Sequence, residues 1–208
     1  MKVLGIVGSP RKEGNTSQLV RQALGGMMGQ GVETEMIHLA DYDFCDCRGC
    51  EGCRETYACV IGDGMQKVYP QLLEADAVVL GSPTYFYDVT ALMKAFLDRL
   101  YCFEAFDDED RSVWMGVNEA LGGKLAVVIS VCEQSKAEDA GFAAKTMAMT
   151  MEALGYRVVD TVQIAGLFAK DEAGADREAQ ARARAAGRRL ARTMLLKQRI
   201  REKLTTQV

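Results

Sequence analysis

Five segments with the character of strands alternate along the chain with five helical segments, and this order restricts the fold more than any other feature. The expected strands cover residues 2–7, 32–39, 77–81, 124–131 and 156–164. The expected helices cover residues 15–28, 64–74, 90–100, 136–154 and 176–203. Pro70 is expected to kink or shorten the second of these helices. Such alternation favours an α/β fold of three layers, with helices on both faces of a parallel sheet.

Five strands match the flavodoxin-type order 2-1-3-4-5 better than a six-stranded dinucleotide-binding sheet. Ligands of such sheets bind beyond the carboxyl ends of the strands, so the loops after Val7, Leu80 and Val131 form the expected site. We find no internal repeat and no linker, and the 208 residues are expected to form a single domain, 1–208. A cysteine-rich loop of about residues 40–62 is expected to follow the second strand.

Seven cysteines against one histidine are the unusual part of the composition. No apolar run approaches the roughly 18 residues of a membrane-spanning helix, and the first residues do not resemble a signal peptide. We therefore expect a cytoplasmic protein that does not bind membranes. In a reducing compartment, this many cysteines indicates metal or redox chemistry more than disulfide bonds.

The turn after the first strand combines three short hydroxyl side chains, an asparagine and an arginine at the start of a helix. Backbone N–H groups at a helix N-terminus attract anions. The turn lacks the Gly-Lys-Ser/Thr triplet of ATP-binding loops and the Gly-x-Gly-x-x-Gly pattern. We expect it to bind a terminal monophosphate, the alternative being an ordinary turn capped by Asn15 or Thr16. The candidate residues are Ser9, Arg11, Asn15, Thr16 and Ser17.

Four of the cysteines follow the pattern C-x2-C-x2-C-x5-C. Residues spaced in this way let their thiolates converge, and four thiolates are what a [4Fe–4S] cluster requires. Structural zinc and redox-active thiols without a metal are the alternatives. Cys45, only two residues before the motif, is expected to be a bystander. The candidate metal ligands are Cys47, Cys50, Cys53 and Cys59.

Three blocks within the first hundred residues together resemble the NAD(P)H-dependent FMN reductase and iron–sulfur flavoprotein group of flavodoxin-like proteins. The blocks are Gly8-Ser9-Pro10-Arg11 with Gly14-Asn15-Thr16, Gly81-Ser82-Pro83-Thr84-Tyr85, and Lys94-Ala95-Phe96-Leu97-Asp98-Arg99. The resemblance implies that the first turn holds the FMN phosphate. It also implies that the loop carrying Pro83, Thr84, Tyr85 and Phe86 lies along the isoalloxazine ring, the alternative being that these aromatic side chains only cover the end of the sheet. The cysteine spacing matches the iron–sulfur flavoproteins, although Gly64 stands where relatives more often carry Asp.

The resemblance implies a flavin-dependent oxidoreductase. Electrons would pass from a donor such as ferredoxin through the [4Fe–4S] cluster to FMN, and on to a small-molecule or protein acceptor. No protein side chain need act as an acid or base. One alternative is an NAD(P)H-dependent FMN or quinone reductase without a cluster. Another is a binding protein that senses redox state or is stabilised by structural zinc. A homodimer or homotetramer is implied as well.

Four further features complete the expectations. Cys102 is expected to pack in the core, while Cys132 follows the fourth strand and lies near the ligand crevice, with packing as its default role. Residues 104–123 begin with five acidic residues in seven, and we expect an exposed acidic loop or a lid. The C-terminal helix carries ten Lys/Arg against three Asp/Glu over residues 176–208. Without aromatic interleaving it is expected to dock on the acidic body or a second subunit, not on nucleic acid.

Overall fold

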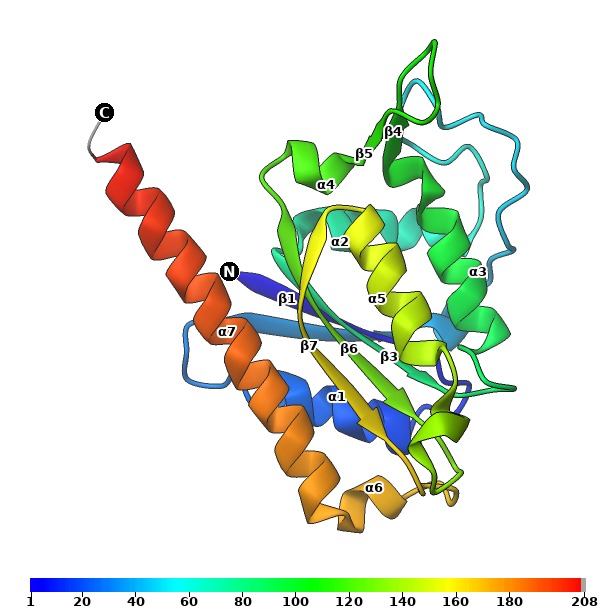
Figure 1. The fold of residues 1–208 in the computed structure, drawn as a ribbon, viewed down its shortest axis with the longest axis vertical. Helices are drawn as coiled ribbons and strands as arrows, with labels where there is room; N and C mark the ends of the chain where they lie inside the picture. The colour runs from blue at the N-terminus through cyan, green and yellow to red at the C-terminus, as the bar shows by residue number, and fades with distance from the viewer. Residues whose placement is uncertain (207–208) are drawn as a thin grey trace.

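The structure is a computed structural model that describes residues 1–206 (Figure 1). Its main sheet contains β1 (Lys2–Val7), β2 (Glu33–His38), β3 (Ala77–Pro83), β6 (Lys124–Val131) and β7 (Tyr156–Ile164). The α-helices are α1 (Asn15–Gly25), α2 (Tyr69–Glu74), α3 (Ala91–Arg99), α4 (Val117–Ala120), α5 (Ala143–Ala153), α6 (Glu172–Ala175) and α7 (Arg177–Thr205). Short 3₁₀ helices are η1 (Leu39–Asp41), η2 (Gly64–Lys67), η3 (Leu100–Phe103) and η4 (Ala137–Ala140). A small hairpin joins β4 (Glu104–Phe106) to β5 (Trp114–Gly116).

The five long strands form one parallel sheet in the order β2-β1-β3-β6-β7. Counted along the sheet-forming strands alone, this is the predicted order 2-1-3-4-5, so the expected α/β fold is confirmed. The register pairs Val7 with Gly81, and Pro83 with Val131. The carboxyl ends of the three central strands therefore lie side by side, where the chain reverses its direction across the sheet.

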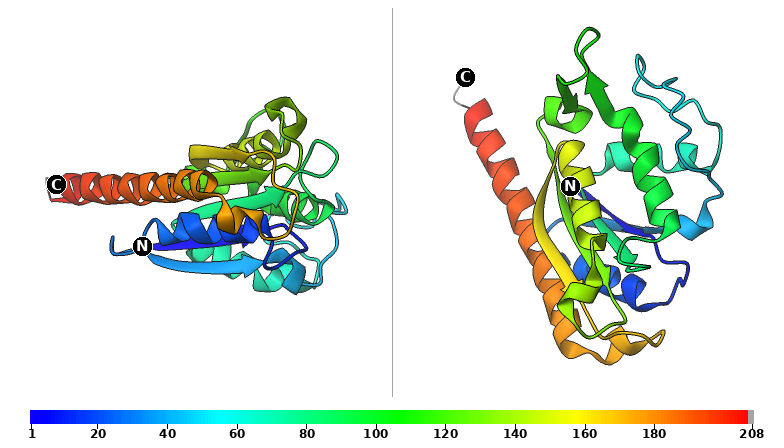
Figure 2. Two further views of the ribbon diagram at one scale, coloured as in Figure 1. Left: turned by 90° about the horizontal axis from the view of Figure 1, so that it is seen from below. Right: turned by 45° about the vertical axis from the view of Figure 1, so that its right-hand side comes forward.

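Alternate residues of the strands serve two separate apolar cores. Leu4 and Ile6 of β1 face the core covered by α2, α3 and α5, whereas Val3 and Val7 face the core covered by α1 and α7. This is the period of two that a strand buried on both faces must follow. Figure 2 shows the sheet between these two helical layers.

Small residues let α1 and α7 approach each other closely. A Cβ atom added to Gly187 of α7 would overlap the carbonyl oxygen of Ala23 in α1, and one added to Gly26 would overlap the carbonyl of Arg184. Ala183 and Ala186 of α7 are fully buried in the same layer. The basic C-terminal helix predicted from the sequence is therefore docked on the body over its first half, through alanine and glycine.

Three segments differ from the expected helices and loop. Residues 64–74 divide into η2 and α2, because Pro70 lies in the first turn of α2 and begins that helix instead of kinking it. Residues 136–154 divide into η4 and α5 at Gly141, whose φ of 58° ends the first helix. Residues 104–123 are ordered as the β4–β5 hairpin and α4. Within residues 1–206, no helix combines the length and the apolar character needed to cross a membrane.

Candidate flavin site and cysteine loop

Two adjoining hollows lie at the carboxyl ends of β1, β3 and β6. The first, of about 90 Å³, is lined by residues of the β1–α1 turn, the end of β3 and the loop after β7. The second, of about 470 Å³, is lined by the loop after β3 and the loop after β6. Thr84, Tyr85 and Glu133 line both hollows, so the two form one continuous depression. This is the crevice that the sheet topology predicts.

The N-terminus of α1 opens into the first hollow without a side-chain cap. Gly14 occupies the capping position that Ser, Thr, Asp or Asn usually fills, and no acidic residue lies in the first turn. Ser9 and Thr16 are almost fully buried beside it, while Arg11 is exposed at the edge of the hollow. Unsatisfied helix amides, hydroxyls and one arginine suit an anion with several acceptor oxygens.

Two of the predicted phosphate-site residues have their side chains engaged with the protein itself. The Asn15 amide donates to the carbonyl of Ala169 at 2.7 Å and accepts from the N–H of Ala173 at 3.0 Å. The Ser17 hydroxyl is fully buried and donates to the carbonyl of Arg11 at 3.3 Å. Asn15 still lines the hollow, but its side chain anchors the loop after β7.

The loop after β3 forms a tight turn that presents aromatic side chains. Tyr85 and Asp88 exchange backbone hydrogen bonds of 2.7 and 3.1 Å across Phe86 and Tyr87. Phe86 and Tyr87 have φ values of 45° and 67°, which residues with a Cβ rarely adopt. Phe86 is fully exposed, and Tyr85 and Tyr87 are about half exposed. Strained, exposed aromatic residues beside a hollow are typical of a binding site rather than of packing.

Other contacts hold this turn in place. Thr84 at the start of the loop donates its N–H to Val131 at 2.7 Å, and its hydroxyl to Ala140 at 3.3 Å. Phe142 donates its N–H to the carbonyl of Tyr87 at 2.6 Å. Pro83 ends β3 and lines the first hollow together with Thr84. The turn is thus fixed by neighbouring loops.

The sequence did not single out several residues that line the depression, among them Gln134 and Asp139 of the segment between β6 and α5. Glu133 follows β6, and Leu167 and Phe168 follow β7. Leu167 returns to this site because its N–H donates to the carbonyl of Cys132 at 3.1 Å. The position of the loop after the fifth strand was the available signal, because it too leaves the sheet at the carboxyl edge.

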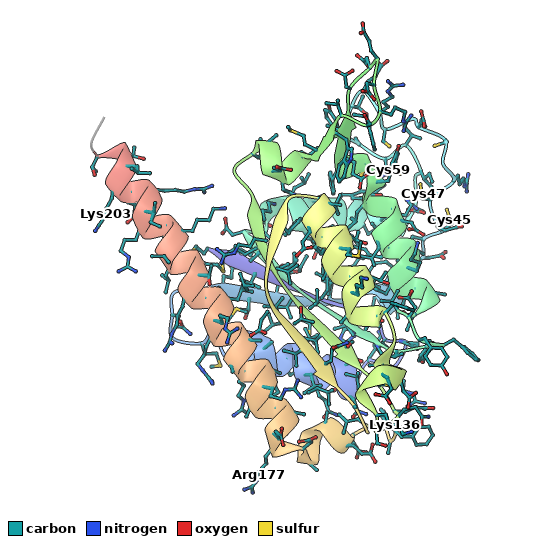
Figure 3. The ribbon with its side chains drawn as sticks, viewed as in Figure 1. Cys45, Cys47, Cys59, Lys136, Arg177 and Lys203 are labelled. Carbon is teal, nitrogen blue, oxygen red and sulfur yellow. The ribbon has the colours of Figure 1, made fainter. Side chains whose placement is uncertain are left out.

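The cysteine loop, residues 42–63 between η1 and η2, contains neither helix nor strand and lies beside α3 (Figure 3). All its thiols are free in the structure, and no three metal-binding side chains converge within residues 1–206. Burial raises the pKa of Cys53, and the nearby thiols of Cys59, Cys47 and Cys50 raise it further. The four predicted ligands are therefore near enough for their charges to interact. Four thiolates near one another fit the chemistry of an iron–sulfur group, although the structure does not show the geometry of a metal centre.

A buried arginine joins the two ends of the cysteine loop. The Arg99 side chain, at the end of α3, is fully buried and binds both carboxylate oxygens of Asp63, at 2.6 and 3.0 Å. Arg99 also donates to the carbonyl of Cys45 at 2.9 Å. Arg99 and the N–H groups of Cys45 and Met65 lower the pKa of Asp63 to about 2. Asp63 therefore stays ionised and ties both ends of the loop to the core.

Cys45, which lies outside the predicted set of ligands, contacts the ion pair that holds the loop. Its N–H donates to the Asp63 carboxylate at 3.1 Å, and its Sγ lies 3.7 Å from both that carboxylate and the Arg48 guanidinium. Cys102 is buried, as expected, and its Sγ lies 3.6 Å from the carbonyl of Arg99. Cys132 is also almost fully buried, and it is among the residues that line the second hollow.

The family model described as NADPH-dependent FMN reductase matches residues 1–170 of the chain. The chain belongs to this family. Iron–sulfur flavoproteins are among its similar relatives: one from Methanocaldococcus jannaschii is 48% identical over 99 residues, which cover 48% of this chain and 51% of that protein. One from Archaeoglobus fulgidus is 42% identical over 100 residues, covering 48% and 46%. The chain thus spans about half the length of the curated relatives it matches.

Solved structures of this family's fold superpose over most of the chain. The NAD(P)H:quinone oxidoreductase from Methanothermobacter marburgensis has a TM-score of 0.67 at 17% identity, covering 90% of this chain and 98% of that one. A flavodoxin from the domain Archaea has a TM-score of 0.57 at 17% identity, covering 93% and 98%. At such identities these likenesses show only the fold of this member of the FMN reductase family.

Proposed function

We propose that the chain is a flavin-dependent oxidoreductase that holds FMN in the depression at the carboxyl edge of the sheet. The observation that carries the proposal is the uncapped N-terminus of α1, which opens beside an exposed arginine into a hollow continuous with an aromatic turn. A site that binds an anion, next to a surface that can hold a flat ring, matches the phosphate and the isoalloxazine ring of FMN. The family match supports the same cofactor.

The chain's own residues would position the flavin and limit its contact with water. The amides of α1, with Arg11, Ser9 and Thr16, would bind the phosphate, while Asn15 would keep the loop after β7 over it. Tyr85 and Phe86 would lie along the ring, and Thr84 and Pro83 would hold the loop that carries them. When bound, FMN supplies transfer of one or two electrons, and an iron–sulfur cluster supplies transfer of one.

We further propose that Cys47, Cys50, Cys53 and Cys59 bind a [4Fe–4S] cluster that receives electrons from a ferredoxin-like donor. The support comes from the thiolate spacing, the nearness of the four thiols and the relatives named iron–sulfur flavoproteins. Nearby Arg48 and Arg54 would favour the reduced, more negative state of the cluster. The acceptor would be a small molecule or a protein.

A second candidate is an NAD(P)H-dependent FMN or quinone reductase without a cluster. Its support is the name of the matching family. Both candidates use the same flavin depression and differ only at the cysteine loop.

Anaerobic purification with flavin, iron and sulfide measured on one sample tests both parts of the proposal. About one FMN and four irons per chain are expected. Flavin without iron or sulfide would leave the second candidate, and stoichiometric zinc without flavin would overturn both. Rapid-mixing reduction by NADPH and by reduced ferredoxin then distinguishes the donors, since the cluster-bearing protein should be reduced faster by ferredoxin.

A further inference from the structure

The last eleven residues of α7 leave the body of the protein. We call residues 195–205 the tail. The last buried residue of α7 is Met194, and every tail residue except Lys197 is exposed. Figures 1 and 2 agree that this part of the helix projects past the sheet, and Lys203 marks its far end in Figure 3. A helix gains most of its stability from packing an apolar face, so a tail of three turns without a buried apolar side chain is unusual.

The tail carries an apolar stripe that faces a hollow. Leu196, Ile200 and Leu204 follow one another at intervals of four residues and are 47%, 48% and 60% exposed. Such spacing places them on one face of the helix. Leu196 and Ile200 line a hollow of about 380 Å³, the tail groove, between the tail and the turns that precede β6 and β7.

Cations surround the apolar floor of the tail groove. Lys124, Arg157, Lys197 and Arg201 line it, and no Asp or Glu does. Lys124 donates to the carbonyl of Leu72 in α2, and Lys197 donates to the carbonyl of Gly122 in the turn after α4, which fixes both side chains in place. Arg157 is exposed on β7. The tail groove therefore suits a partner that is both apolar and acidic.

The β4–β5 hairpin of the same chain has that chemistry. It protrudes from the body near the end of the molecule where the tail lies (Figure 1). Its turn carries Asp107, Asp108, Glu109 and Asp110, all exposed. Directly after the turn come Val113, Trp114 and Met115, which are 59%, 48% and 46% exposed. A surface patch that combines large apolar residues with acids on a protruding hairpin is typical of an interface.

The charges within the hairpin are only partly balanced by its own chain. Arg54 binds Asp108 at 3.1 Å, and Arg111 is directed to Glu51 at 2.8 Å. Asp107 and Asp110 accept hydrogen bonds from neighbouring N–H groups, which keeps the turn rigid. The Glu109 carboxylate forms no hydrogen bond or ion pair with the described residues, so it can pair with a cation of a partner.

We propose that the acidic hairpin of one copy of this chain docks in the tail groove of a second copy. Few residues of the chain separate the hairpin from the tail groove, because only α4 and a glycine turn join the hairpin to Gly123 in the groove. In the proposed dimer the two surfaces pair reciprocally across a two-fold axis, so each contact occurs twice. Two tails packed on each other would instead bring like charges together.

Light scattering after gel filtration of the full chain tests the proposal, with one variant at each surface. Ile200→Asp in the tail groove and Trp114→Ala on the hairpin are each expected to shift a dimer to monomer. Leu195→Asp is the matched control, because Leu195 is exposed on the same helix but does not line the groove. Circular dichroism confirms that each variant is folded. A monomeric wild type, or a dimer that only Leu195→Asp disrupts, would overturn the proposal.

Charge exchange tests which surfaces meet. Arg157→Glu and Glu109→Arg should each weaken the dimer about tenfold, and the double variant should recover most of the loss. A photoreactive amino acid at position 114 provides a second measurement, using a mixture of ¹⁵N-labelled and unlabelled protein. Mixed-isotope cross-links to residues 193–201 support the proposal. Cross-links within one chain only, or capture of nucleic acid by the groove, overturn it.

Discussion

The guanidinium of Arg99 and the carboxylate of Asp63 form a bidentate ion pair beneath the cysteine loop, with N···O distances of 2.6 and 3.0 Å. The Arg99 side chain is fully buried, and that of Asp63 is 18% exposed. Because Cys45 is bound to both partners, this pair fixes the two ends of a loop that has no regular structure of its own. The loop is held from the core, independently of any metal.

We expect Asp63→Asn to lower the free energy of unfolding by about 3 kcal/mol, because it leaves the Arg99 charge buried without a counter-ion. Urea unfolding of the protein without cofactors measures this loss. Hydrogen exchange of residues 46–62 should become faster in the same variant, since one end of the cysteine loop is released.

Asp98→Asn is the matched control for this prediction. Asp98 pairs with Lys94 one turn away on the surface of α3, where both side chains are about half exposed. Exposed pairs of this kind contribute less than about 1 kcal/mol. Equal losses in the two variants would show that the Arg99–Asp63 pair does not hold the loop.

Acid should remove the contribution of Asp63 to stability. The pKa of Asp63 is lowered in the folded chain to about 2, against roughly 4 for an unfolded aspartate. A lowered pKa means that the stabilisation is complete above pH 4 and is lost as the pH falls toward 2. The difference in unfolding free energy between wild type and Asp63→Asn should therefore shrink over this window. A difference that stays constant from pH 6 to pH 2 would contradict the assignment.

The Arg11 side chain should contribute to phosphate binding alone. Arg11 is exposed and forms no ion pair with the described residues, so Arg11→Ala should leave thermal stability unchanged. Loss of one charge-assisted hydrogen bond should weaken FMN about tenfold, as measured by quenching of flavin fluorescence. Riboflavin, which lacks the phosphate, is the control ligand. Equal weakening of FMN and riboflavin would place Arg11 elsewhere in the site.

The strands and their order followed from the sequence because burial on both faces of a parallel sheet requires continuous apolar segments such as Ala77–Leu80. That the turn after β1 lines a hollow at the carboxyl edge was also predictable, since a glycine and hydroxyls between a strand and a helix are typical of an anion-binding turn. Residues Ser9, Arg11 and Thr16 came together as expected, and Pro83, Thr84 and Tyr85 joined them. Their roles in binding, and the single-domain organisation, stay predictions.

Long-range pairs could not be predicted from local pattern. Arg99 and Asp63 lie 36 residues apart, and Asn15 binds a backbone more than 150 residues away. Neither contact follows a repeating pattern in the sequence, because each depends on how loops of different length bring distant residues together. The hairpin at residues 104–116 was missed since its strands are only three residues long. Its acidic composition indicated only an exposed segment.

The left-handed backbone conformation of Phe86 should lower the stability of the unliganded chain, and flavin binding should offset this loss. A residue with a Cβ in the left-handed region is roughly 1 kcal/mol less stable than glycine there. Phe86 has a φ of 45° and a side chain that is fully exposed, so its ring contributes no packing in the unliganded chain. We therefore expect Phe86→Gly to raise the free energy of unfolding by about 0.5 kcal/mol and to weaken FMN binding several-fold.

Phe168→Gly, at an exposed phenylalanine without positive φ, is the control and should give no such gain in the free energy of unfolding. Thermal unfolding and flavin titration of both variants check the prediction, and a destabilised Phe86→Gly with unchanged FMN affinity would show that this ring serves packing alone.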